Sequence, residues 1–191
     1  MIEFCSDGGP LAVMNQSVFS QTLVERAMGI LQLDDATYES IEHDSNATTQ
    51  AAAIVVVVGI ASGIGAIRDS AANILLGPIG QVISWLIVSA LIYFVGTKMI
   101  PSGSTEADLG QVLRLVGFAM VPQVANIFGF IPYLGALIAF VASIWGLVCL
   151  IKAIKHALEM STGRAIATGI IASLIALIPL AILGIGLFAA S

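Results

Sequence analysis

Apolar residues form long runs over the last three quarters of the chain, separated by short segments of polar residues, glycine or proline. A helix needs about 20 predominantly apolar residues to cross the hydrocarbon core of a bilayer. The first run, at about 48–67, closes at Arg68, and the second, at about 79–97, is entered through Gly77 and Pro78. The pattern therefore predicts two membrane-spanning helices in the first half of the apolar region.

The apolar stretch 115–151 is too long for one span and just long enough for two. We expect it to fold as a hairpin, with the turn in segment 128–135, where glycine and proline permit a reversal and aromatic residues suit the headgroup level. A fifth span is predicted at 165–188, with Pro179 as a kink inside it. An alternative in which the third segment is re-entrant remains open.

An amphipathic helix is predicted at 18–33, before the apolar region. At 100° per residue one half of its circumference is apolar, comprising Phe19, Leu23, Val24, Ala27, Met28, Ile30 and Leu31. Arg26 falls on the polar half and is its single basic residue, so anionic lipid would not hold the helix electrostatically. We expect burial of the apolar half to hold it, on a membrane surface or on a partner.

A second short helix is predicted at 35–44. Asp34 or Asp35 can serve as its N-cap, and Leu33, Tyr38 and Ile41 share one side. The acidic residues between them are expected to form a solvated face.

Composition narrows the class of protein. The 191 residues are 58% hydrophobic and 10% charged, against about 25% charged in soluble domains, which excludes a water-soluble enzyme or a nucleic-acid-binding protein. Most of the acidic residues precede residue 50, so the net charge of -5 belongs to the N-terminal segment. That segment has no apolar run resembling a signal peptide, and the first span is expected to act as the insertion signal.

Positive residues set the expected orientation. With five spans, Arg26, Lys98, Arg114, Lys152, Lys155 and Arg164 lie on one side of the membrane, and Arg68 lies on the other. The excess of positive charge marks the cytoplasmic side. The chain is therefore predicted to lie in the cytoplasmic membrane, with its N-terminus in the cytoplasm and its C-terminus on the outer side.

The predicted spans contain no ionisable residue in their interiors, which argues against a proton-coupled transporter because such groups mark ion pathways. A facilitator for small neutral solutes remains an alternative, with Gln123 and Asn126 beside Pro122 as polar lining. We favour a packing role for both amides, as hydrogen-bonding groups between helices or toward the carbonyl that proline leaves free.

The sequence contains no recognisable catalytic or cofactor-binding motif. The sequence has no P-loop and no nucleophile elbow, and the pair His156 and Glu159 lacks the further ligands that a metal needs. Cys5, in the tail, and Cys149, in a predicted span, are not expected to form a disulfide. We therefore expect no enzymatic activity, no cofactor and no metal.

Small residues recur at spacings that let helices approach closely. Gly59 and Gly63 are four apart in the first span, and Gly169 and Ser173 are four apart in the fifth. Such pairs typically form helix contacts, either within one chain or between two.

A basic cluster lies between the fourth and fifth predicted spans. Lys152, Lys155, His156 and Arg164 are close enough to the bilayer to meet lipid phosphates or the acidic N-terminal helices. The positive-inside role explains them most simply. The alternative is a contact with Asp34, Asp35, Glu39 or Glu42 that folds the tail back over the membrane face.

Three short motifs stand out in the apolar region: Gly117-Phe118-Ala119 followed by Pro122, Trp145-Gly146, and segment 154–165 with Gly163 and Arg164. Together with the predicted tail and five spans, they resemble the Yip family of five-span membrane proteins. Segment 33–44 is similar to the tail of bacterial members. The resemblance implies a membrane fold and a role in organising membranes or complexes. The Asp-Leu-Tyr-Gly-Pro element of eukaryotic members is absent and Phe118 lacks a tyrosine hydroxyl, so binding to their Rab-type GTPases does not carry over.

We therefore predict an all-α membrane protein with a cytoplasmic tail at 1–47, carrying the interfacial helix, and a five-span membrane domain at 48–191. The expected function is non-catalytic: a scaffold or accessory subunit that organises the membrane or a membrane protein complex. Its expected partners are membrane lipids and other integral membrane proteins or a second copy of the chain, with no nucleic acid.

Overall fold

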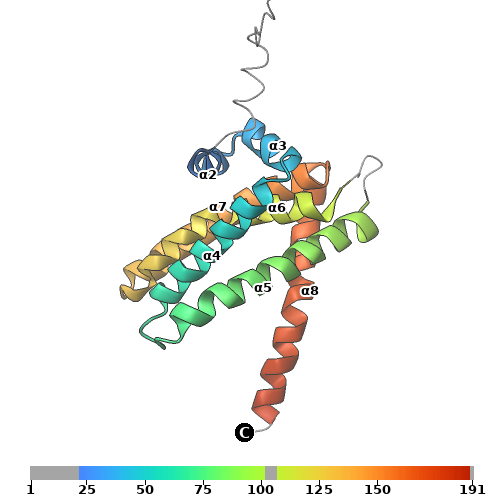
Figure 1. Ribbon diagram of the computed structural model, residues 1–191. Coiled ribbons are helices and arrows are strands. Elements are labelled where there is room, and N and C mark those ends of the chain that lie inside the picture. The colour runs from blue at the N-terminus through green and yellow to red at the C-terminus, as the bar shows by residue number, and fades with distance from the viewer. Residues whose placement is uncertain (1–21, 102–106, 190–191) are drawn as a thin grey trace, which may run out of the picture.

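The computed structural model describes residues 22–101 and 107–189, with side chains up to residue 176. Every regular element in these ranges is helical (Figure 1). Two short helices, α2 (Leu23–Leu31) and α3 (Asp35–His43), come first. The longer elements follow in the order α4 (Ala47–Gly65), α5 (Asn73–Phe94), η1 (Val95–Met99), α6 (Leu109–Ala119), η2 (Val121–Phe130), α7 (Leu134–Ala157) and α8 (Thr162–Ala189).

Three of the helices among the described residues are long and apolar enough to cross a membrane: α4, the continuous helix Asn73–Met99 formed by α5 and η1, and α7. The pair α6 and η2 adds a fourth if it counts as one passage with a bend of 41°. α8 runs to Ala189 and includes Pro179, but the part with described side chains, Thr162–Ala176, is shorter than a full span. The all-helical membrane fold is confirmed, with three to four candidate spans.

The second apolar helix begins earlier than the sequence predicts. The helix α5 starts at Asn73, so Pro78 lies inside it and not at its entry. The side-chain amide of Asn73 donates a hydrogen bond to the Ala66 carbonyl at 3.0 Å. The proline removes one backbone hydrogen bond in the second turn of the helix. The backbone of Pro78 is packed against Gly59 of α4.

The predicted hairpin turn is confirmed. η2 ends at Phe130 and α7 begins at Leu134, with Tyr133 between them at a φ of 60°. Pro122 stands in the first turn of η2, next to the bend that separates η2 from α6. A proline accounts for a break here because it cannot donate the backbone bond that would continue α6.

α4 lies at the centre of the helix packing, against α5, α6 and η2. A Cβ added to Gly59 would lie 2.5 Å from the Cα of Pro78, and one added to Gly63 would lie 2.3 Å from the carbonyl oxygen of Asn73. The predicted glycine pair therefore lies in a contact within the chain, between α4 and α5. In α8, a Cβ on Gly169 would come within 3.3 Å of Ile154 in α7, whereas Ser173 is exposed and donates to the Gly169 carbonyl.

The two halves of the bent pair lie near opposite ends of α4. Near the middle of α6, Arg114 donates to the carbonyl oxygen of Glu42 in α3 at 2.6 Å, and Gly117 lies against Ala51 in the second turn of α4. At the end of the pair, Gly129 of η2 lies against Gly65, the last residue of α4. The pair thus runs alongside α4 over its length.

α8 takes a different course from the other long helices. It contacts α5, η1 and α7, and Figure 1 shows it crossing near one end of these helices and extending away from them.

Candidate functional site

The side of α2 that is buried differs from the side that the sequence predicts. Thr22 caps the helix, and the backbone amide of Thr22 in turn bonds the Glu25 carboxylate at 2.8 Å, a reciprocal capping box. Ile30 is buried, but Val24 and Met28 are 66% and 50% exposed. The predicted apolar half is therefore split between an inward side and an exposed outward stripe, while Phe19 lies outside the described residues.

Arg26 is buried rather than solvated, which corrects its predicted place on the polar half of the helix. One guanidinium nitrogen contacts the Asp44 carboxylate at 2.6 Å and the other donates to the Gln50 side chain at 2.9 Å. Burial alone would raise the pKa of Asp44, but the hydrogen bonds from Arg26 and from the Asn46 amide outweigh it and hold the pKa below its ordinary value. A buried guanidinium requires such partners. The ion pair therefore joins α2 to the end of α3, and the hydrogen bond to Gln50 joins α2 to the first turn of α4.

The acidic side of α3 is only partly solvated, so the predicted solvated face is wrong at two positions. Asp34 caps the helix as expected, and Tyr38 and Ile41 are fully buried. Glu42 and Asp44, however, are also buried. Burial raises the pKa of Glu42, and the nearby carboxylates of Glu159 and Glu39 add to the effect.

Three hydrogen-bond donors on α7 bind backbone carbonyls at the C-terminal end of α2 and just after it. Trp145 Nε1 donates to the Leu31 carbonyl at 3.1 Å, Cys149 Sγ to the Ile30 carbonyl at 3.6 Å, and Lys152 Nζ to the Leu33 carbonyl. The last carbonyls of a helix have no partner within it and need donors from elsewhere. The three side chains are spaced by four and three residues, so they share one face of α7.

The same face of α7 contacts the start of α3. The Asp35 carboxylate lies 3.1 Å from Lys152 Nζ and 2.9 Å from His156 Nε2, and these contacts lower its pKa. The His156 ring stacks on Tyr38 with 5.4 Å between centroids, and the Tyr38 hydroxyl donates to the Cys149 carbonyl at 3.3 Å. We call the α2 and α3 contacts with Trp145, Cys149, Lys152 and His156 the tail seam.

The structure separates the basic residues that the sequence groups together. Lys152 and His156 belong to the tail seam, with Asp35 as the acidic partner. Lys155 lines an adjacent polar hollow with Glu39 and Glu42. Arg164 is exposed at the start of α8, and Gly163 beside it faces open space.

The family-motif residues of the third apolar segment lie at the break between α6 and η2. Phe118 and Pro122 are buried. A Cβ on Gly117 would lie 2.8 Å from that of Ala51 and 3.2 Å from Trp85 Nε1, which donates to the Leu113 carbonyl. Gly117 therefore permits the close contact of α6 with α4 and α5.

Sequence reasoning missed the roles of Trp145 and Cys149 in the tail seam. The signal was present, because Trp145, Cys149, Lys152 and His156 recur at helical spacing and all carry a group that can donate a hydrogen bond. The acceptors of Trp145 and Cys149 are backbone carbonyls of α2, however, and no side-chain pattern marks those.

Comparison with known proteins gives one match. A family model described as the Yip1 domain matches residues 28–183, from within α2 to within α8. No curated protein and no solved structure matches the chain. The matched segment includes the tail seam, the break between α6 and η2, and the contact between α7 and α8.

Proposed function

Because the chain belongs to the Yip family, its Yip1 domain covering residues 28–183, we propose that it is a non-catalytic membrane protein that organises the bilayer or a membrane protein complex. In this role it is a scaffold, or an accessory subunit of a protein complex, in the cytoplasmic membrane. The observation that carries the proposal is the outward stripe of α2, Val24 and Met28, which the tail seam holds at the surface. The family match lends no support to a solute facilitator.

The position of α2 supports contact of this stripe with the membrane. Trp145, which donates to the end of α2, lies near the middle of α7 and is itself 41% exposed. α2 also contacts α6 and η2. It therefore lies against the C-terminal half of α7 and the first turn of α4, near the ends of these helices that we place on the cytoplasmic side. At this level, lipid or the helix of a membrane partner can cover an apolar side chain.

Replacing Val24 and Met28 together by serine should weaken this contact. We expect the double variant to insert normally but to lose most of the lipid or protein partners retained by the wild-type chain, because serine removes the apolar area that drives binding. The measurement is purification in mild detergent from the native membrane, followed by mass analysis of the stoichiometry of retained proteins and lipids.

The matched control replaces the same two residues by leucine, which keeps the stripe apolar. It should retain the wild-type stoichiometry. Equal retention by the serine and leucine variants would refute a role for the stripe. Defined proteins at a fixed ratio would identify an accessory subunit, and lipid alone would point to organisation of the bilayer.

We further propose five passages, formed by α4, α5 with η1, the bent pair α6 and η2, α7, and α8. The third passage is supported by the bent pair, which runs alongside α4 from near its start to its last residue. A re-entrant loop would instead return to the side of the membrane on which it began. Support for the fifth is the 28-residue length of α8. The positive residues then place the N-terminus in the cytoplasm and the C-terminus outside.

A reporter that is active only on one side of the membrane tests this topology. Fused after Ser191, a reporter that needs the outer compartment should be active, and the same reporter inserted within residues 102–106 should be inactive. Activity at 102–106 but not after Ser191 would contradict the proposed orientation, and equal activity at both sites would contradict five passages.

A further inference from the structure

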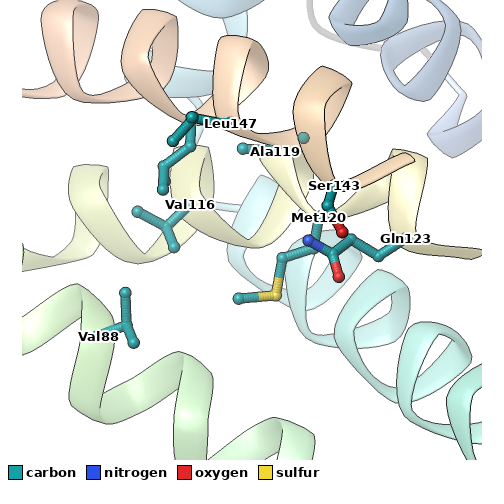
Figure 2. Close-up of a pocket in the computed structure, with 9 residues that line it drawn as sticks. Val88, Val116, Ala119, Met120, Gln123, Ser143 and Leu147 are labelled. Atoms are coloured by element: carbon teal, nitrogen blue, oxygen red, sulfur yellow. The ribbon is translucent and has the colours of Figure 1, made fainter. Parts of the chain in front are cut away.

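A cavity of about 180 Å³ lies beside the break between α6 and η2. Its walls come from α5, α6, η2 and α7 (Figure 2), and most of them are apolar, including Val88, Val116 and Leu147. Two polar side chains, Gln123 of η2 and Ser143 of α7, complete the lining. Leu147 is 56% exposed, so this wall of the cavity meets the lipid-facing surface of α7.

The Gln123 side chain is partly buried, and its amide has no hydrogen-bond partner among the described residues. Figure 2 shows the amide among the cavity-lining side chains Met120 and Ser143. The second amide of this region, Gln81, donates to Met120 Sδ at 3.3 Å. An amide without a partner is costly at membrane depth, where no bulk water replaces the missing bond.

Gly146 lets the Gln123 amide lie close to α7, because a Cβ at this position would come within 3.3 Å of the amide nitrogen. The room for a partner is the cavity itself, which the Gln123 side chain lines. The Ser143 hydroxyl already donates to the Ala139 carbonyl at 2.7 Å, so the available donor of the cavity is the Gln123 amide. An apolar cavity of about 150 Å³ can hold a single small ring, and this one adds a hydrogen-bond donor at its wall.

We propose that this cavity binds a small neutral molecule, or the ring of a larger lipid-soluble one, that enters from the bilayer and presents a carbonyl oxygen to Gln123. The apolar walls select an uncharged body, and the amide selects an acceptor oxygen. This site is separate from the outward stripe of α2 and does not depend on the function proposed for it.

The test uses two probes of nearly equal shape, cyclohexanone and methylenecyclohexane, on the full chain in lipid nanodiscs. A ligand that binds the folded state raises Tm in a saturable way. We expect the ketone to raise the Tm of the wild-type chain by a few degrees and the hydrocarbon to raise it much less. Gln123→Leu should abolish the difference between the probes, and Gln81→Leu should keep it.

Equal effects of ketone and hydrocarbon on the wild-type chain would overturn the proposal, and would indicate a cavity filled by acyl chains. No saturable effect of the ketone would also overturn it. The comparison of probes on the wild-type chain needs no substitution, so a variant that fails to fold does not remove the test. A ketone effect that persists in Gln123→Leu would place the binding elsewhere.

Discussion

Gly59→Ala should destabilise the membrane domain by about 1 to 3 kcal/mol, the usual cost of forcing extra atoms into a packed contact. The added methyl group would lie 2.5 Å from the Cα and 2.9 Å from the nitrogen of Pro78, and 3.0 Å from the carbonyl oxygen of Gly77. All three are backbone atoms, so no side-chain rotation relieves the overlap. α4 and α5 have to move apart, which weakens the contact around which the other helices pack.

Gly80→Ala is the matched control, since a Cβ at Gly80 meets nothing within 4 Å. Both glycines are helical, so both substitutions gain the same helix propensity, about 1 kcal/mol in soluble helices. We expect Gly80→Ala to be neutral or stabilising. Unfolding of the purified chain by heat or by denaturing detergent measures the difference, and equal stability of the two variants would show that α4 and α5 do not touch at Gly59.

Much of the membrane fold could be predicted because lipid imposes a simple constraint on sequence. A passage needs a long apolar run and its ends need polar or turn residues, so the hairpin around Tyr133 and the extent of α4 were readable from the chain. The start of α5 was not, because a proline usually marks a helix entry. Pro78 is tolerated inside this helix where it packs on Gly59.

The tail shows what a helical pattern alone leaves undetermined. Periodicity placed Ile30 in the apolar half of the first helix and Tyr38 and Ile41 on one side of the second, and all three are buried. It placed Arg26 on a solvated face, because a charged residue is buried only when a specific partner is available. That partner, Asp44, lies 18 positions away in the sequence, and nothing local pairs the two. The same limitation applies to the tail seam, where α7 side chains bind backbone atoms of α2.

The buried ion pair of Arg26 and Asp44 should control whether the tail stays docked. The two side chains are 1% and 8% exposed. Removing one partner of a buried pair typically costs about 3 to 5 kcal/mol because the other charge remains buried without compensation. We therefore expect Asp44→Ala to release α2 from the tail seam. Cleavage by trypsin after Arg26, which is inaccessible in the docked tail, measures the release.

Asp35→Ala is the control for this prediction, since it also removes an aspartate that pairs with basic residues of the tail seam. Asp35 is 70% exposed, and ion pairs of exposed side chains contribute little to stability because water screens them. Its loss should leave trypsin cleavage near the wild-type rate. Equally fast cleavage of the two variants would show that the buried pair is not what holds the tail.

The pH dependence of docking gives a second test of the same pair without a substitution. The pKa of Asp44 lies below its ordinary value of 3.8, so its contribution is fully present above pH 3.8 and is lost as the pH falls through the lowered pKa. Glu42 acts in the opposite direction: its raised pKa means that burying its charge is unfavourable, and mild acid relieves this cost. The tail should therefore stay docked from neutral pH down to about pH 4 and be released only below it. Pepsin, which is active in acid, should cleave the segment at 22–33 only in that lower range, and cleavage that begins well above pH 4 would show that the pair of Arg26 and Asp44 does not control docking.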